Sequence, residues 1–161
     1  SYCAFSPVKG QENMLYIAMA EGNQIWRVDV GNLEGKDINT YPGEGYAGKA
    51  IVEGQVAGKG WEDGLLRNAK FNNHQICFTE DGKLYIADCG NNCIRVIDTR
   101  LSIDKATVST PIGLPGMKGY KDGGPDIAMF NHPFGVAVSA DGQIVYVADT
   151  GNKVIRKLSI E

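Results

Sequence analysis

One phrase occurs three times in the sequence, and this repetition constrains the fold more than any other feature. It reads LYIADCGNNCIRVID at 84–98, VYVADTGNKVIRKL at 145–158 and LYIAMAEGNQIWRVDV at 15–30. Tyr85 and Tyr146 lie 61 positions apart, and Tyr16 precedes Tyr85 by 69 positions. Self-similarity at a nearly fixed period indicates a repeat architecture in which each copy is one supersecondary unit.

The second and third copies also agree in the connection that precedes the phrase. GKGWEDGLLRNAKFNN at 58–73 aligns with MKGYKDGGPDIAMFNH at 117–132. The residues shared by the two connections are Gly60, Asp63, Gly64, Ala69, Phe71 and Asn72 in the second copy, and Gly119, Asp122, Gly123, Ala128, Phe130 and Asn131 in the third. Agreement of this extent at one period makes coincidence untenable.

Each copy consists of short apolar runs separated by turn signals. A run at 76–79 or 136–139 leads into Asp81–Gly82 or Asp141–Gly142. Asp-Gly between apolar runs is a strong hairpin signal because Gly tolerates the positive φ of a tight turn. A second strand, a Gly-Asn turn and a third strand follow, and the second copy offers a fourth strand at 105–112. We therefore expect an antiparallel meander in every copy.

Both faces of such a meander are apolar. Tyr85 and Ala87 point to one face and Leu84 and Ile86 to the other, because side chains alternate along a strand. A sheet with two apolar faces must pack against a neighbour on each side. Four-stranded sheets repeated radially form a β-propeller, so the predicted fold class is all-β, with three four-stranded antiparallel blades.

These residues resemble NHL repeats, whose pattern runs approximately DG–A–F–P–G, an apolar strand, and D–G–LYVAD–N–IRK. The third copy matches from Asp122 to Lys157, whereas the second reads FNNHQI where the pattern has its Pro and Gly, and the first has Met19 in place of Asp. The chain also resembles, more loosely, NHL-type propellers of secreted and surface proteins of gut Bacteroidetes. The resemblance implies NHL-type blades in a six-bladed ring, and an extracytoplasmic location in the periplasm or at the cell surface.

The expected organisation is a single propeller segment over residues 1–161. Its blades are expected at about 1–55, 56–114 and 115–161, the last without its outer strand. Closed propellers usually have four to eight blades, so further blades are needed. They come either from the rest of a longer parent propeller, which is the arrangement we favour, or from a second copy of the chain that closes a ring as a dimer.

Charge and composition exclude several function classes. The net charge is −3 and no basic block occurs, so nucleic acid is not an expected partner. No apolar run approaches the ~20 residues of a membrane span. The sequence has no serine nucleophile elbow, zinc motif or phosphate loop, so no cofactor and no metal are expected. GEGYAGKA at 43–50 is Gly-rich and is interpreted as a loop, and a disulfide between Cys89 and Cys93 stays open.

Polar residues that recur around the Gly-Asn turn are interpreted as structural. An Asp or Asn there can bond the backbone N–H groups of the turn, and an Arg on the third strand can form an ion pair with the Asp. Arg27 is taken as the first-copy counterpart of these arginines. The predicted structural set is Asp88, Asn91, Arg95, Asp149, Asn152 and Arg156.

The connections between blades supply the candidate ligand-binding residues, because loops on a rigid scaffold often carry function. An aromatic ring two residues before a carboxylate can stack on a sugar ring while the carboxylate accepts its hydroxyl groups. The alternative is that the Asp caps a turn and the ring covers a blade edge. Two histidines near the expected central channel complete the set. The candidates are Trp61, Asp63, His74, Tyr120, Asp122 and His132.

The sequence therefore predicts a non-catalytic binding or scaffolding module that recognises protein or glycan through one face. The alternative is a propeller hydrolase or lyase with histidines or metal ligands at the central channel. His74 and His132 stand at unmatched positions, three and two residues after the shared Phe, and this argues against a joint catalytic role. RNA binding is a third hypothesis, which the acidic charge disfavours.

Overall fold

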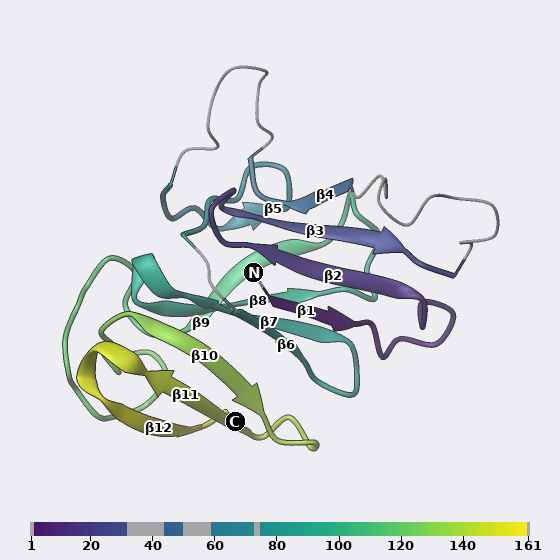
Figure 1. Cartoon of the computed structure of the whole chain (residues 1–161). Helices are drawn as coiled ribbons and strands as arrows, with labels where there is room; N and C mark the ends of the chain where they lie inside the picture. Colours follow the sequence, from purple (N-terminus) through teal and green to yellow (C-terminus); the bar gives the residue numbers. More distant parts are fainter. Residues whose placement is uncertain (1, 32–43, 50–58, 73–74, 161) are drawn as a thin grey trace.

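A computed structural model describes residues 2–31, 44–49, 59–72 and 75–160, which form three antiparallel β-sheets (Figure 1). The first sheet has the order β1-β2-β3-β4 and consists of β1 (Tyr2–Phe5), β2 (Met14–Met19), β3 (Gln24–Asp29) and β4 (Glu44–Ala47). The second has the order β5-β9-β8-β7-β6 and consists of β5 (Gly64–Leu65), β6 (Gln75–Phe78), β7 (Lys83–Asp88), β8 (Cys93–Asp98) and β9 (Thr107–Ile112). The third has the order β10-β11-β12 and consists of β10 (Pro133–Val138), β11 (Ile144–Asp149) and β12 (Val154–Ser159).

The predicted Asp-Gly hairpins are confirmed. Gly82 and Gly142 adopt φ values of 90° and 71°, in the region that favours glycine. Each turn closes when the Gly N–H donates to a carbonyl three residues earlier, at 3.1 Å to Thr79 and 2.8 Å to Ser139. The β6–β7 and β10–β11 pairs therefore begin from the same turn chemistry.

The Gly-Asn turns form single 3₁₀ turns, η1 (Cys89–Asn91) and η2 (Thr150–Asn152). Each ends in a residue with a φ of 58°, Asn92 in one and Lys153 in the other. The left-handed residue reverses the chain, so that the second and third strands pair directly on both sides of the turn.

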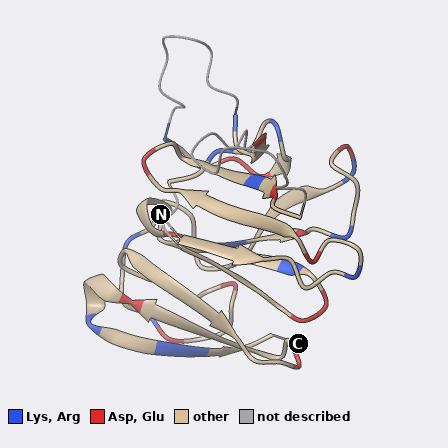
Figure 2. Cartoon of the chain, turned by 45° about the vertical axis from the view of Figure 1, so that its right-hand side comes forward, with Lys and Arg blue, Asp and Glu red and all other residues tan. Residues whose placement is uncertain are grey.

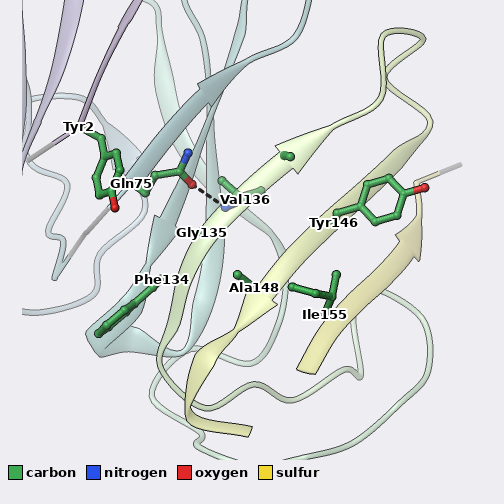
Figure 3. Close-up of a pocket in the computed structure, with 9 residues that line it drawn as sticks. Tyr2, Gln75, Phe134, Gly135, Val136, Tyr146, Ala148 and Ile155 are labelled. Carbon is green, nitrogen blue, oxygen red and sulfur yellow. Dashed lines mark hydrogen bonds between the residues drawn. The ribbon is translucent and has the colours of Figure 1, made fainter. Parts of the chain in front are cut away.

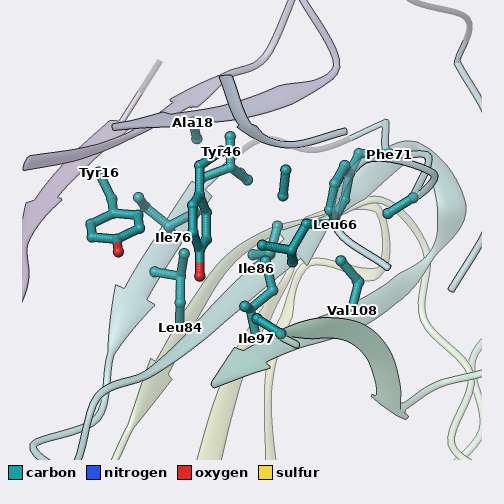
Figure 4. Close-up of a cluster of buried hydrophobic side chains, with 14 residues drawn as sticks. Tyr16, Ala18, Tyr46, Leu66, Phe71, Ile76, Leu84, Ile86, Ile97 and Val108 are labelled. Carbon is teal, nitrogen blue, oxygen red and sulfur yellow. The ribbon is translucent and has the colours of Figure 1, made fainter. Parts of the chain in front are cut away.

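The second sheet packs against the first on one face and against the third on the other. Leu84 and Ile86 lie in a buried cluster with residues of the first sheet (Figure 4), whereas Tyr85 and Ala87 lie in a cluster with residues of the third. The predicted alternation is thus confirmed. Full burial of one such large apolar side chain contributes about 1.5–3 kcal/mol, so these two interfaces hold the sheets together.

The outer face of the third sheet has no cover among the described residues. Tyr85 and Ile94 are buried against the third sheet, but their counterparts 61 residues later, Tyr146 and Ile155, are 40% and 71% exposed. The same repeat position therefore lies in a core in one sheet and on the surface in the next.

Two segments differ from the sequence-based expectation. Glu44–Ala47 was predicted to be part of a loop but forms β4, because strand pairing uses backbone groups that a Gly-rich segment also supplies. Gly64–Leu65, within a predicted connection, adds a short strand beside β9. The described part of the chain contains no α-helix, and it contains no helix long and apolar enough to span a membrane.

Candidate functional site

A buried arginine organises the connection that leads into the second sheet. The Arg95 side chain is fully buried on β8, and its Nη1 donates to Asp88 Oδ2 at 2.6 Å and to the Lys70 carbonyl at 2.8 Å. Its Nη2 donates to the Glu62 carbonyl at 2.7 Å and to Asp63 Oδ1 at 2.8 Å. One guanidinium group thus joins two segments of the preceding connection, residues 62–63 and Lys70, to the strands β7 and β8.

The Asp88 carboxylate is the second hub of this network. Its Oδ1 accepts from the Asn72 backbone N–H at 2.7 Å, and its Oδ2 accepts from the Asn91 side-chain amide at 2.9 Å. The same amide of Asn91 also donates to the Gly60 carbonyl at 2.7 Å. Burial raises the pKa of the Asp88 carboxyl, while Arg95 and these amide donors act in the opposite direction. The carboxylate is therefore fully engaged inside the fold.

The third sheet repeats the network almost atom for atom. Arg156 Nη1 donates to Asp149 Oδ2 and to the Met129 carbonyl, both at 3.0 Å. Its Nη2 donates to the Lys121 carbonyl at 2.6 Å and to Asp122 Oδ1 at 2.7 Å. The residues that were predicted to be structural in the second and third copies thus contact one another in equivalent positions.

Aromatic rings lie against both guanidinium groups. The Cζ atom of Arg95 is 4.9 Å from the ring centre of Phe71. That of Arg156 lies between two rings, 5.0 Å from Tyr120 and 5.1 Å from Phe130. Cation–π contacts of this kind add attraction that increases when water is excluded, and they place Tyr120 in the network as well.

The first sheet lacks this network, and the assignment of Arg27 as its arginine was wrong. Arg27 pairs with Tyr16 in the strand register, whereas Arg95 pairs with Ile86, so the true counterpart of Arg95 is Trp26. The phrase contains no gap here, and a count from the shared Tyr would have shown the offset of one residue. Arg27 instead forms an ion pair with Glu44 on β4, at 2.7 Å.

Both carboxylates predicted as ligand contacts, Asp63 and Asp122, form ion pairs with the buried arginines. Asp63 accepts from Arg95 and also from the Thr110 hydroxyl at 2.9 Å, and Trp61 Nε1 donates to the same hydroxyl at 3.0 Å. Asp122 bonds to Arg156, yet its side chain remains 80% exposed. In the second copy, Trp61 and Asp63 therefore both contact Thr110 of their own sheet.

The two histidines differ in what the structure describes. His74 lies outside the described residues. His132 is exposed at a φ of 49°, its backbone N–H donates to Asn92 Oδ1 at 2.9 Å, and its Nδ1 lies 2.8 Å from Asn131 Oδ1. This residue thus links the 3₁₀ turn of the second sheet to the entrance of the third. Within the described ranges, no three His, Cys, Asp or Glu side chains form a group suited to a metal ion.

All four cysteines are free thiols in this structure. Cys3 is exposed, Cys77 is half-buried, and Cys89 and Cys93 are buried. Burial raises the pKa of Cys77 and of Cys89 to about 11, and it raises that of Cys93 further. These three groups are thus neutral thiols at physiological pH.

A cavity of about 410 Å³ opens where the first strands of the three sheets lie side by side (Figure 3). Tyr2 of β1, Gln75 of β6 and Gly135 of β10 border it, with Phe134 beside them and Tyr146 across from them. Sequence reasoning missed this cavity, because its residues follow no common motif. The only available signal was their shared place at the start of each first strand.

Gln75 fixes the geometry of this cavity. Its Oε1 accepts from the Val136 backbone N–H at 2.6 Å, and its Nε2 donates to the Ile76 carbonyl at 2.9 Å. The side chain therefore bridges β6 and β10, so that two neighbouring sheets hold a fixed distance at the floor of the cavity. The aromatic rings of Tyr2 and Phe134 are 49% and 42% exposed around it.

Comparisons with known proteins agree with this architecture. Residues 71–97 match the family described as NHL repeat. NHL repeat-containing protein 2 of Gallus gallus is 33% identical over 102 residues, which cover 62% of this chain and 13% of that protein. The chain therefore spans only a small part of the curated relative.

Solved structures show the same arrangement of strands. An auxiliary nutrient binding protein from Bacteroides thetaiotaomicron aligns with a TM-score of 0.68 and 25% identity over 91% of this chain and 34% of that one. An auxiliary nutrient binding protein from Bacteroides ovatus aligns with a TM-score of 0.71 and 24% identity over 93% of this chain and 35% of that one. Taken with the three antiparallel sheets, these matches show that residues 71–97 carry an NHL repeat and that the chain folds into blades of an NHL-type β-propeller.

Proposed function

We propose that the chain is a non-catalytic binding module that recognises glycan or protein through the end of the blades where β1, β6 and β10 begin. The observation that carries this proposal is the convergence of three equivalent positions on one cavity. Tyr2, Gln75 and Gly135 each pair with the Ala of the neighbouring second strand, so they occupy the same place in the repeat. They nevertheless carry three different side chains.

The three cavity positions differ between the copies, whereas the positions of the arginine network repeat. Positions that hold the blades together repeat between copies, as Asp88 and Asp149 do, because each blade has the same structural need. The cavity positions differ, although each pairs with the same place on the neighbouring second strand. A difference of this kind is expected where residues serve a ligand that contacts several blades at once.

The chemistry of the cavity suits a flat, partly apolar ligand. Its volume of about 410 Å³ lies within the ~300–1,000 Å³ of typical ligand sites. The rings of Tyr2 and Phe134 offer faces for the C–H face of a sugar or for an aromatic side chain. The auxiliary nutrient binding protein with a related fold also supports a binding role.

We extend the proposal to the setting of the chain. The partners are a glycan or protein ligand, together with further blades of a parent propeller or a second copy of this chain. The location is extracytoplasmic, in the periplasm or at the cell surface, as the resemblance to Bacteroidetes propellers implies.

A titration with defined probes tests the proposal. Cellohexaose, xylohexaose and maltohexaose are added to the 161-residue chain, a displayed library of linear peptides is screened in parallel, and ¹H–¹⁵N spectra map the binders. We expect saturable shifts around Tyr2, Gln75 and Phe134. Tyr2→Ala and Phe134→Ala are each expected to weaken binding about fivefold or more, the size expected for a lost aromatic contact.

Phe5→Ala is the matched control, because Phe5 is a 55% exposed ring at the opposite end of β1. It should leave the affinity unchanged. The proposal fails if neither the sugars nor the peptides give a binder, or if the selected binders are as sensitive to Phe5→Ala as to Tyr2→Ala.

A further inference from the structure

A second cavity lies at the opposite end of the first strands from the cavity at Tyr2. It has a volume of about 400 Å³ and is bordered by the β6–β7 turn and the β10–β11 turn. Gln75 at the start of β6 borders the cavity at Tyr2, whereas Thr79, directly after the end of β6, borders this one. We call it the turn cavity, and both turns belong to hairpins that the structure describes in full.

The same place between the first and second sheets is filled by a side chain. The first copy has a longer connection between its first two strands, residues 6–13, and Val8 of this connection packs against Gly82. A Cβ on Gly82 would lie 2.5 Å from Val8 Cγ2. Gly142 is the counterpart of Gly82 in the third copy, and a Cβ there would meet no atom within 4 Å. The turn cavity is thus a space that is occupied at one blade interface and open at the next.

A buried hydroxyl group reaches this cavity without a partner. Tyr85 is only 6% exposed, its ring packs between the second and third sheets, and the residue borders the turn cavity. Burial raises the pKa of this phenol, and the nearby Cys77 and Asp81 raise it further, so the hydroxyl lies towards the Asp81 turn. It makes no hydrogen bond to any residue that the structure describes. A buried tyrosine hydroxyl normally has a hydrogen-bond partner, so this group is available to a ligand.

The carboxylate of the second-copy turn already has cations beside it. Asp81 Oδ2 lies 3.7 Å from Lys83 Nζ and 3.7 Å from Arg100 Nη1. Lys83 directly follows Gly82, so this turn supplies one of its own counter-ions.

The carboxylate of the third-copy turn has no such cation. Asp141 Oδ1 accepts from the Ser139 hydroxyl at 2.5 Å and from the Gln143 backbone N–H at 3.0 Å. The neutral residues Gln143 and Ile144 follow Gly142, where Lys83 follows Gly82. Among the described residues, no cation forms an ion pair with Asp141. Its negative charge is therefore uncompensated at the border of the cavity.

The charges around the turn cavity favour a cationic ligand. Its lining contains the carboxylates of Glu80, Asp81 and Asp141 but only one ammonium group, that of Lys83. Both turns carry acidic residues, which Figure 2 shows in red. Within the described ranges these carboxylates do not form a group suited to a metal ion. An organic cation that reaches separate acceptors fits this arrangement better than a compact ion.

We propose that the turn cavity binds a primary ammonium group on a short alkyl chain, with Asp141 as its counter-ion and the Tyr85 hydroxyl as a hydrogen-bond acceptor. An ammonium group has three donors and no acceptor, so it matches a site that offers carboxylates and a hydroxyl oxygen. The ammonium group belongs either to a free amine or to a lysine side chain of a partner protein. This site is separate from the cavity at Tyr2 and does not rest on the proposed function.

Three probes test the proposal and distinguish the two sources. 1,5-Diaminopentane represents a free amine, a lysine blocked at both its amino and carboxyl ends represents a side chain, and pentane-1,5-diol is the uncharged control. Each is added to the 161-residue chain and followed by ¹H–¹⁵N spectra. We expect saturable shifts at residues 79–83 and 139–143 with at least one amine and none with the diol. Affinity should fall as salt is added, because exposed charges are screened.

Substitutions locate the bound ammonium group. Gln143→Lys places a lysine directly after the Asp-Gly pair, as in the second copy, and should weaken binding about tenfold or more because its own ammonium group competes for Asp141. Tyr85→Phe keeps the buried ring and should weaken binding about fivefold. Asp126→Asn is the matched control, because Asp126 is exposed, lies outside the cavity lining and changes the net charge by the same amount as Gln143→Lys. It should leave the affinity unchanged.

Three results would overturn the proposal. They are the absence of saturable shifts with both amines at millimolar concentration, equal affinity for the diol and the amines, and a Gln143→Lys variant that binds as tightly as Asp126→Asn. Shifts confined to the cavity at Tyr2 would contradict it as well. A destabilised variant, detected by a thermal melt, would not prevent a decision, because the three probes on the parent chain decide independently.

Discussion

The first and second sheets share a strand frame but differ in what lies inside it. β2–β3 and β7–β8 pair over six residues each in the same register. The second sheet buries Arg95 and Asp88, whereas the first has Trp26 and Met19 at those places. The comparison shows that the alternation of apolar side chains along the strands and the tight turns are sufficient to form the sheet. The buried ions serve a separate purpose, which is to fasten the connection that leads into it.

This contrast agrees with the energetics of buried ion pairs. A well-packed apolar replacement of a complete pair is often neutral, but removal of one partner leaves a buried charge uncompensated. The first sheet has the partly buried Met19 and Trp26 at the places of Asp88 and Arg95, so it shows apolar residues that the same strand pairing accepts. It supplies the substitutions with which the comparison can be tested.

The largest expected effect comes from Arg95→Ala. This substitution leaves the Asp88 carboxylate buried without its cation and removes the donors to the Glu62 and Lys70 carbonyls. We therefore expect the free energy of unfolding to fall by about 3–5 kcal/mol. Urea denaturation followed by fluorescence measures it. The double variant Asp88→Met with Arg95→Trp copies the first sheet and should recover more than half of the loss. A double variant as unstable as Arg95→Ala would show that the two sheets are not interchangeable.

The next effect extends the comparison to the third sheet. Ile94 and Ile155 occupy the same repeat position, but Ile94 is buried and Ile155 is 71% exposed. Ile94→Ala should cost about 2–5 kcal/mol in unfolding free energy, and Ile155→Ala less than about 0.5 kcal/mol. Equal losses would mean that another blade or a second copy covers Ile155 in solution, and light scattering across a dilution series would then identify a dimer.

A smaller effect is expected at the turn after the second strand. A Cβ on Gly90 would lie 1.8 Å from Asn72 Nδ2, whereas one on Gly22 would meet its nearest neighbour, Met19 Cβ, at 3.4 Å. Gly90→Ala should therefore cost about 1–3 kcal/mol through overpacking, and Gly22→Ala should be nearly neutral. Thermal melts of the two variants measure the difference. A melting temperature for Gly90→Ala equal to that of the parent would show that Asn72 moves aside without cost.

The smallest effect concerns thiol chemistry. Cys3 of the first sheet is exposed and should react with a disulfide reagent within seconds at pH 7.5, while the three cysteines of the second sheet should react slowly. Cys3→Ser should abolish the fast phase, and denaturation should reveal four thiols in the parent. Two fast thiols in the parent would indicate that the second sheet opens more readily than its burial implies.

The same thiols give a pH dependence with a definite sign. The pKa values of Cys77 and Cys89 are raised from 9.0 to about 11 in the folded chain. Their contribution to stability is complete below pH 9.0 and is lost as the pH rises through about 11. Denaturation midpoints should thus fall in this alkaline window, and replacement of Cys77 by Ser should reduce the fall.

The strand frame was predictable because its signals are local. Asp81–Gly82 and the alternation around Tyr85 identify turns and faces without knowledge of distant contacts. β4 was missed because Glu44, Gly45 and Ala47 have low strand propensity, and pairing with the edge of β3 makes the segment a strand. The cavity at Tyr2 was missed for a related reason, since it arises from residues that become neighbours only after three sheets have packed.

The arginine network has a consequence for the order in which the chain is made. Every partner of Arg95 in this network precedes it in the sequence, from Glu62 to Asp88, and the same holds for Arg156 and its partners from Lys121 to Asp149. During synthesis the arginine is thus the last component of each network to leave the ribosome, and none of its own partners lies downstream. Such short-range closure favours folding blade by blade behind the growing end, with each finished sheet offering its face to the next.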